Sequence, residues 1–374
     1  MSMLYVKEIS QTRSDLQNFV KFPTAIYKND PNYVPLSSSR QIRMLLGRRN
    51  TLLTNGVQCF LMAYEGRRAL GRLLIGIDFR SIQKTGKRQG YISLFECVND
   101  QTVADALFTS ALSFLKANAV TSVIGPAPAL FACFDTGLQV KGFQNASSYL
   151  SPYNPPYYAG LFEKFGFHKY KDYHAYDLPV TALETKEYEN VLQRAGNRFG
   201  YRVDHVNLQK ELRQYTRAFA RIIAESTPVE WEAVLPTAET LYRELKQIRS
   251  LLWTEYIVMA YAQDRPIGFL LVIPDANTIQ GFQDQLRSSS ALRPFFAKVR
   301  IERLHTTMLY VVPDFQNKGV EMMMSYRVLK AARAHGVRRV ETSMIDERNI
   351  KMQTSVEKIG GMVSKVYRQY QLEL

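Results

Sequence analysis

Apolar runs separated by short polar turns predict a β-hairpin at two distant places in the chain. The stretch FLMAYEGRRALGRLLI, residues 60–75, has two apolar runs around a charged turn, and IVMAYAQDRPIGFLLV, residues 257–272, has the same layout. Apolar runs of this length on both sides of a short turn are typical of a hairpin. Both stretches have Met-Ala-Tyr before the turn, and an apolar residue, Gly and then Leu-Leu after it. This likeness indicates an internal repeat.

A second pair of similar stretches lies further along each half. LFEKFGFHKYKDYHAYDL covers residues 161–178, and SVEKIGGMVSKVYRQYQL covers residues 355–372. Each has Glu-Lys, a Gly two residues later, and then Lys, two Tyr and Leu at matching positions. Glycine after a helical segment is a common helix stop, so each stretch predicts a helix end followed by a strand. Two matches in the same order, at nearly equal offsets, indicate a duplicated unit.

Between these stretches each half carries a predicted strand, helix and strand. They are residues 92–98, 103–119 and 122–126 in the first half, and 306–312, 320–336 and 338–345 in the second. The sequence therefore predicts two copies of one α/β unit, residues 1–185 and 186–374. The boundary is expected between Pro179 and Asn190, where a polar stretch begins a fresh helical pattern. A length of 374 residues agrees with two domains, because a single core rarely serves so long a chain.

The order hairpin, strand, turn, helix, strand, helix ending in Glu-Lys-x-Gly, and strand resembles the GNAT acyltransferases. The likeness spans both halves and is sharper in the second, where LYVVPDFQNKGV, residues 309–320, is similar to the acyl-CoA arm of that family. Gln316, Lys318 and Gly319 stand at matching positions of the arm, whereas Glu321 replaces its second small residue. The resemblance implies an α/β (α+β) fold of two tandem GNAT-like domains. Each domain would hold a mixed, mostly antiparallel sheet flanked by helices.

The residues of the arm also predict cofactor binding on physical grounds. A helix N-terminus leaves unsatisfied N–H groups with a partial positive charge, and Gly319 lets the backbone approach a diphosphate. Lys318 adds a point charge. Leu309 to Val311 would form a strand whose free edge bonds the pantetheine amides as an added strand does. The alternative is a plain strand-to-helix turn that binds nothing.

The cofactor implied by the resemblance is acetyl-CoA or another acyl-CoA, with no metal. Asn349 matches an Asn that faces the cofactor in the family. The expected cofactor-binding residues are Leu309, Tyr310, Val311, Gln316, Asn317, Lys318, Gly319, Val320 and Asn349.

The first half lacks the features of the arm. Its turn, FECVNDQTVADAL, has no glycine and places Glu96 and Asp100 where the phosphate would sit, and carboxylates repel a diphosphate. We expect this copy to act as a scaffold or as one wall of a substrate cleft between the domains. The segment YLSPYNPPYYAGLFEKFGF, residues 149–167, is rich in tyrosine around Pro-Pro. Its substrate-binding candidates are Tyr153, Asn154, Tyr157 and Tyr158, and a structural loop packed on the core is the alternative.

Acyl transfer to an amine needs a base, an oxyanion donor and an acid for the leaving thiolate. The N–H near Val311 is the candidate oxyanion donor. His305, which titrates in a useful range, and Glu302 are the candidate bases, since they lie on or just before the cofactor strand. A structural role for either is the alternative.

The family often places the acid two residues before the Lys of Glu-Lys-x-Gly, where this chain has Val356. Tyr310 or Tyr326 are possible substitutes, with a core role as the alternative. The sequence contains no H-E-x-x-H, G-x-S-x-G, Walker or Rossmann signature, which leaves hydrolase, kinase and dehydrogenase interpretations without support.

Composition and charge narrow the ligand class. Forty-eight Lys and Arg against 34 Asp and Glu give a net charge of +14, which favours acidic ligands such as CoA, nucleic acid or an acidic carrier protein. The three cysteines, Cys59, Cys97 and Cys133, form no pair motif and are expected to be reduced and buried. No signal peptide or membrane span is evident, so a soluble, cytoplasmic protein without a membrane partner is expected.

These observations predict an acyl-CoA-dependent N-acyltransferase. Its cofactor would lie in the second domain, and its acceptor, a small-molecule or peptide amine, between the domains. The alternative is a catalytically inactive protein that senses acyl-CoA or binds RNA. The sequence leaves the acceptor, the acyl chain length and the oligomeric state open.

Overall fold

The computed structural model describes residues 3–47, 51–128, 136–144, 146–183, 186–231, 233–278 and 300–374. Within this part of the chain, the contacts divide into two compact units. Unit 1 comprises Met1–His174 and Lys365–Leu374, and unit 2 comprises Ala175–Ser364. Cys59 and Cys97 are buried free thiols, and Cys133 lies outside the described residues.

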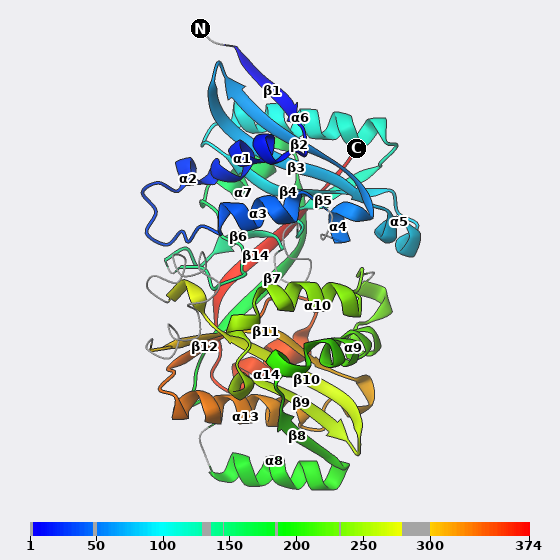
Figure 1. The fold of residues 1–374 in the computed structure, drawn as a ribbon, viewed down its shortest axis with the longest axis vertical. Helices are drawn as coiled ribbons and strands as arrows, with labels where there is room; N and C mark the ends of the chain where they lie inside the picture. Colours follow the sequence, from blue (N-terminus) through cyan, green and yellow to red (C-terminus); the bar gives the residue numbers. More distant parts are fainter. Residues whose placement is uncertain are drawn as a thin grey trace. The chain divides into compact units, whose positions relative to one another are not determined.

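Unit 1 combines helices with the strands of one sheet (Figure 1). Its elements are β1 (Leu4–Ile9), α1 (Arg13–Lys21), α2 (Pro23–Ile26), α3 (Ser38–Leu45), α4 (Thr51–Thr54), β2 (Gly56–Glu65), β3 (Arg68–Asp78), α5 (Phe79–Thr85), β4 (Gln89–Cys97), α6 (Gln101–Ala117), β5 (Ser122–Gly125), β6 (Leu138–Lys141), α7 (Tyr158–Phe165) and the start of β7 (His168–Pro179). Neighbours from β1 to β4 pair antiparallel, and β4 pairs parallel with β5. The expected hairpin is β2–β3, in which Glu65 faces Arg68 across the turn.

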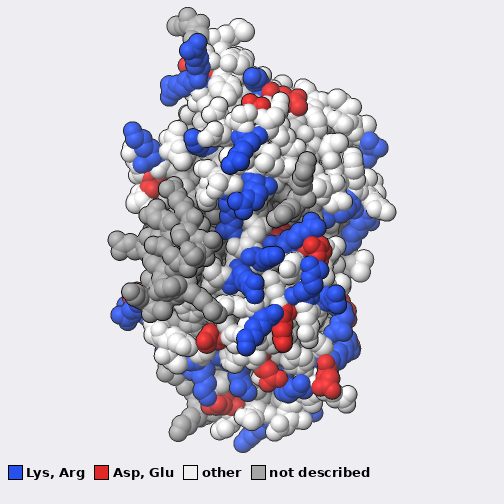
Figure 2. Space-filling view, viewed as in Figure 1, with Lys and Arg blue, Asp and Glu red and all other residues white. Residues whose placement is uncertain are grey.

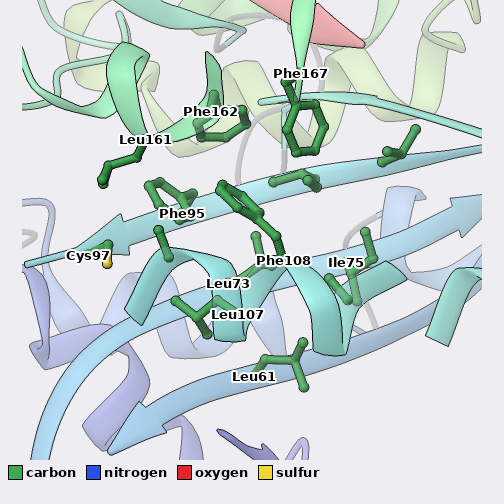
Figure 3. Close-up of a cluster of buried hydrophobic side chains, with 14 of the residues drawn as sticks. Leu61, Leu73, Ile75, Phe95, Cys97, Leu107, Phe108, Leu161, Phe162 and Phe167 are labelled. Atoms are coloured by element: carbon green, nitrogen blue, oxygen red, sulfur yellow. The ribbon is translucent and has the colours of Figure 1, made fainter. Parts of the chain in front are cut away.

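The core of unit 1 lies between this sheet, α6 and α7, as Figure 3 shows. Phe108 of α6 stacks on Phe95 of β4 at 5.1 Å between ring centroids, and Phe162 of α7 meets Phe95 edge-on at 5.0 Å. Each such buried side chain stabilises the fold by about 1.5–3 kcal/mol. A Cβ on Gly71 would come within 2.7 Å of Leu107 Cδ1, so glycine on β3 allows α6 to pack closely.

Unit 2 repeats the hairpin, strand, helix, strand and helix of unit 1 and begins with one additional helix, α8. Its elements are α8 (Lys186–Phe199), β8 (Tyr201–His205), α9 (Leu208–Ser226), η1 (Val229–Trp231), α10 (Ala238–Gln247), η2 (Arg249–Leu251), η3 (Thr254–Tyr256), β9 (Ile257–Ala262), β10 (Arg265–Pro274), η4 (Ala276–Thr278), β11 (Arg303–Val311), η5 (Pro313–Phe315), α13 (Val320–Ala334), β12 (Arg339–Glu341), β13 (Ile345–Asp346), α14 (Ile350–Lys358) and the start of β14 (Met362–Glu373). Neighbours from β8 to β11 pair antiparallel, and β11 pairs parallel with β12. The predicted mixed, mostly antiparallel sheets flanked by helices are thus confirmed.

The two faces of the unit 2 sheet carry different helices. Phe219 of α9 stacks on Phe269 of β10 at 4.0 Å between ring centroids. On the other face, a Cβ on Gly268 would lie 3.5 Å from Met324 Cε of α13. Side chains of β10 and β11 therefore point alternately toward α9 and α13.

Each sheet is completed by a strand from the other half of the sequence. The end of β14 pairs with β5 in unit 1, where Tyr370 faces Gly125. The end of β7 pairs with β12 in unit 2, where Leu178 faces Val340. Figure 1 shows β14 in red reaching the cyan β5. The sequence boundary between residues 185 and 186 stays a prediction, because these units are defined by contacts and not by chain order.

The exchange is reciprocal at the level of single hydrogen bonds. Tyr370 Oη donates to Glu163 Oε1 of α7 at 2.8 Å, and Tyr176 Oη donates to Glu357 Oε1 of α14 at 3.0 Å. These two tyrosines occupy matching positions of the repeat, as do the two glutamates. Each helix that ends in Glu-Lys-x-Gly is thus held by the exchanged strand of the same unit.

Positive charge is visible at the surface, where Figure 2 shows Lys and Arg side chains spread across the face drawn. Within the described ranges, no helix combines the length and the apolar character needed to cross a bilayer. The same residues contain no cluster of three or more His, Cys, Asp and Glu that is suited to a metal ion.

Candidate functional site

An open strand edge leads to the glycine turn of unit 2. β11 pairs with β12 only over Arg303 to His305, whereas its pairing with β10 continues to Val311. A bulge at Thr307 interrupts the β10 register, and Thr307 Oγ1 donates to Leu271 O at 3.0 Å. Beyond His305, the described residues therefore provide no strand on the β12 side of β11. The parallel strands separate at this point.

The register shows which backbone groups face this edge. Val311 lies opposite Gly268, and Val312 N donates to Ile267 O at 2.8 Å. In an antiparallel pair, that bond marks Val311 as a non-hydrogen-bonded position, whose N–H and C=O point away from β10. Leu309, two residues earlier, has the same orientation. The N–H and C=O groups of both residues therefore face the open edge.

A tight turn joins the edge to α13. Gln316 Nε2 donates to Val311 O at 2.9 Å, across η5. Asn317 and Gly319 then adopt positive φ angles of 59° and 81°, which favour short polar residues and glycine. Tyr201 Oη donates to Lys318 O at 3.1 Å and fixes the turn. Gly319 precedes α13 without a side-chain capping bond, so peptide N–H groups are presented at this helix start.

Glu321 lies in the first turn of α13, where the sequence departs from the arm motif. Burial raises the pKa of Glu321, and a hydrogen bond from its own backbone N–H opposes that shift. The carboxylate thus uses one of the N–H groups of the helix start. It also places a negative group beside the position that a phosphate would occupy.

Lys318 and Asn349 are held by contacts within unit 2. The Lys318 ammonium lies 5.1 Å from the centre of the Phe315 ring and 5.6 Å from that of Phe199. Asn349 Oδ1 accepts from Met352 N at 3.3 Å and so caps α14. Asn349 therefore has a structural role, and its contact with a cofactor stays a prediction.

His305 and Tyr310 share one face of the sheet. Their β10 partners, Ile273 and Phe269, are four residues apart and so point the same way, toward α9. His305 is buried and lies in register with Glu341, which is fully buried and accepts from Arg303 Nη2 at 2.5 Å. Tyr310 is half-buried against the Phe269 ring, 5.7 Å away.

The other catalytic candidates lie elsewhere in unit 2. Glu302 precedes β11, and its half-exposed side chain pairs with Arg300 at 3.6 Å. Tyr326 is buried on α13. Val356 packs with Tyr176, and it brings no hydroxyl to the site.

The corresponding strand edge in unit 1 is occupied. β4 pairs with β5 only over Gln89 to Tyr91, and Cys97 matches Val311 because each faces the glycine of its hairpin. Cys97 N donates to Tyr158 Oη at 2.9 Å, and Tyr157 Oη donates to Cys97 O at 2.8 Å. Two tyrosine hydroxyls thus bind the groups that point outward in unit 2.

The acidic residues of this turn have structural partners. Asp100 Oδ1 accepts from Thr102 N at 2.8 Å and caps α6. Glu96 is largely buried, 3.5 Å from Arg72 Nη2, and accepts from Tyr27 Oη at 2.9 Å and Tyr158 Oη at 2.8 Å. Burial raises the pKa of Glu96, which Arg72 and the two tyrosines partly offset.

The sequence interpretation missed this network. Its available signal was Arg72, a cation inside the apolar run ALGRLLI, which requires a buried acidic partner.

The predicted substrate residues of unit 1 also make contacts within the protein. Tyr153 Oη donates to Asp30 Oδ2 at 2.7 Å. Asn154 is buried, accepting from Gln139 N at 2.7 Å and donating to Gln139 O at 3.1 Å. With Tyr157 and Tyr158 on the β4 edge, these residues hold the fold of unit 1 together. Substrate binding by any of them stays a prediction.

Two curated proteins are similar to this chain over almost its full length. No protein-family model matches the chain. It is 25% identical to Protein YghO of Escherichia coli, over 97% of this chain and 94% of that protein. It is 24% identical to the bacterial ceramide synthase of Caulobacter vibrioides, over 97% and 96% of the two chains.

Solved structures show the same fold at low sequence identity. A tandem GNAT protein from the clavulanic acid biosynthesis pathway superimposes with a TM-score of 0.56 at 11% identity, over 99% of this chain and 98% of that chain. A GCN5-related N-acetyltransferase from Sphaerobacter thermophilus gives a TM-score of 0.55 at 12% identity, over 99% and 95%. The likeness covers both units of the chain.

Proposed function

Because this chain has the tandem GNAT fold, we propose that it is an acyl-CoA-dependent N-acyltransferase whose acyl-CoA binds in unit 2. One observation carries the choice of unit. β11 has an open edge that leads into an uncapped glycine turn at a helix N-terminus, whereas Tyr157 and Tyr158 occupy the matching edge of unit 1.

The proposed binding mode follows from the groups at this edge. The pantetheine arm bonds Leu309 and Val311 as an added strand, on the side where β12 has separated from β11. The diphosphate lies against the N–H groups from Gly319 onward, with Lys318 adding charge. Glu321 opposes this arrangement, so the peptide groups must outweigh its repulsion.

The proposed chemistry is attack of a neutral amine on the thioester carbonyl. The Val311 N–H, directed at the open edge, stabilises the oxyanion of the tetrahedral intermediate. His305 is the proposed base that takes the amine proton, directly or through water, and Tyr310 on the same face is the proposed acid for the thiolate. The products are an amide and free CoA.

The class of the amine acceptor is proposed from the name of a sequence relative. The bacterial ceramide synthase that this chain resembles over almost its full length is named for a product that is the amide of a long-chain amino alcohol. We propose an acceptor of this class, a primary amine on a long apolar chain, and a fatty acyl-CoA as the donor.

Substitution of Gly319 tests the cofactor site. Fatty acyl-CoA should raise the melting temperature of the wild-type protein, since a ligand of the native state stabilises by mass action. Gly319→Glu should abolish the shift, because it adds a side chain and a negative charge at the diphosphate position. Gly336→Glu is the matched control, with a φ of 75° and no atom near its Cβ position.

Thiol release then tests turnover. A long-chain amino alcohol should release CoA thiol from fatty acyl-CoA, whereas the Gly319→Glu protein should not support release. Loss of the thermal shift in both glycine variants, or in neither, would contradict the assignment of the turn.

The presence of Val356 favours a second candidate function, acyl-CoA binding without catalysis. This buried residue stands where the family often has an acid, so a protein that binds acyl-CoA without transferring the acyl group is the alternative. A thermal shift with acyl-CoA, combined with no thiol release on any amine, would support the sensor.

A further inference from the structure

Helix α8 ends beside the glycine turn of unit 2. A Cβ on Gly319 would lie 3.6 Å from Ala195 Cβ of α8, and the neighbouring Tyr201 Oη bonds Lys318 O. Nearer the N-terminus of α8, Glu189 Oε1 lies 2.8 Å from Lys330 Nζ of α13. These contacts align α8 along α13 and hold its last residues next to the phosphate turn.

Two cations share one aromatic ring at this end of α8. The guanidinium carbon of Arg198 lies 5.3 Å from the centre of the Phe199 ring, and the Lys318 ammonium lies 5.6 Å from the same centre. Arg198 and the Phe199 ring are exposed. Cation–π contact explains why such a ring is tolerated at the surface.

Arg198 and Lys318 have no acidic partner among the residues that the structure describes, because no carboxylate oxygen there lies within salt-bridge distance of either side chain. Two like charges near one ring repel each other, and an anion close to both of them relieves that repulsion. The geometry therefore favours a negatively charged ligand at this point.

The proposed ligand carries a suitable group. Besides its diphosphate, CoA has a phosphomonoester on the 3′ oxygen of its adenosine ribose, and such a group carries between one and two negative charges near neutral pH. Guanidinium groups bind phosphate through paired N–H donors, and aromatic rings stack on adenine. We propose that Arg198, Lys318 and Phe199 form the site for the 3′-phosphorylated adenosine of CoA.

This site rests on the proposed function and adds donor selection to it. An acyl carrier protein presents its acyl group on phosphopantetheine, which lacks both adenosine and the 3′-phosphate. The pair of cations therefore makes the chain select acyl-CoA over a carrier-bound acyl group.

The experiment compares CoA with dephospho-CoA, which differs only in lacking the 3′-phosphate. Calorimetric titration of the full chain at fixed salt should show CoA binding about tenfold more tightly, as expected for one charge-assisted contact. Arg198→Ala should remove most of that difference by weakening CoA alone. Arg217→Ala, an exposed arginine on α9 at the opposite face of the unit 2 sheet, should retain the difference.

The outcomes of these titrations separate the 3′-phosphate site from the proposed function. Equal affinity for CoA and dephospho-CoA in the wild-type protein, or an unchanged ratio in Arg198→Ala, overturns the 3′-phosphate site and leaves the proposed function standing. Phe199→Leu should weaken both ligands by the same factor if adenine stacks there, and a loss confined to CoA would contradict stacking. Absence of binding by either ligand overturns the proposed function, and this site with it.

Discussion

At Glu321 a carboxylate lies where the proposed ligand carries its own negative charge. Burial raises the pKa of this residue in the free protein. A diphosphate beside it disfavours the ionised form further, so the complex holds the proton up to a higher pH than the free protein does. Binding then takes up protons, and CoA affinity should rise as the pH falls through the titration range of Glu321.

Glu321→Gln should therefore bind CoA more tightly at neutral pH, by about tenfold, or ~1.4 kcal/mol. It should also lose the part of the pH dependence that Glu321 contributes. CoA titrates in the same range through its own phosphate, so the informative quantity is the difference between variant and wild type across pH. Glu230→Gln, an exposed carboxylate in η1, serves as control. Equal pH profiles for Glu321→Gln and wild type would show that the diphosphate does not lie beside Glu321.

Among the elements, β4 and β11 are equivalent strands with different outer edges. In unit 1 the Tyr158 hydroxyl accepts from Cys97 N and donates to Glu96, so it satisfies two buried groups. Tyr158→Phe should lower the free energy of unfolding by about 1–3 kcal/mol, because both groups lose a partner. Denaturant unfolding measures the loss, with the exposed Tyr170→Phe as control.

The same variant tests whether unit 1 lacks a cofactor site. The stoichiometry of CoA binding should stay at one per chain in wild type and in Tyr158→Phe, because Asp100 still caps α6 where the phosphate would lie. Two CoA per chain in either protein would show that the capped edge is a usable site.

Local sequence patterns determine the hairpins, the helix ends and the turn before α13. The Met-Ala-Tyr hairpins, the Glu-Lys-x-Gly helix ends and the Gly319 turn are set by nearby residues, so they could be predicted. The bonds of Tyr157 and Tyr158 to Cys97 join residues some 60 positions apart, and periodicity carries no information on such pairs. The Arg72–Glu96 pair escaped prediction for the same reason.

For the whole molecule, the exchange of β7 and β14 was beyond sequence reasoning because the two strands are alike. Tyr176 and Tyr370 occupy matching positions, and so do their partners Glu357 and Glu163. Either strand offers the same hydroxyl to either helix, so the residue pattern fits both the direct and the exchanged pairing. The structure shows that the exchanged pairing is formed.

Because β14 completes the sheet of unit 1, we expect a truncation at the C-terminus to unfold unit 1. A protein ending at Ser364 loses the segment of β14 that pairs with β5, including Tyr370, which is fully buried in unit 1. Unit 1 should therefore unfold although the deletion lies nearly 200 residues beyond its other strands in sequence, whereas unit 2 keeps its completing strand, β7.

Hydrogen exchange can locate the damage. Amide protection in β4 and β5 should fall in the truncated protein, while β9, β10 and β11 stay protected. A chain ending at Leu372 keeps Tyr370 and its bond to Glu163, so it should retain protection in both units. If β4 and β5 stay protected without residues 365–374, unit 1 does not depend on the exchanged strand. If β9 to β11 lose protection first, the deleted segment supports unit 2 instead, and the assignment of β14 to unit 1 is wrong.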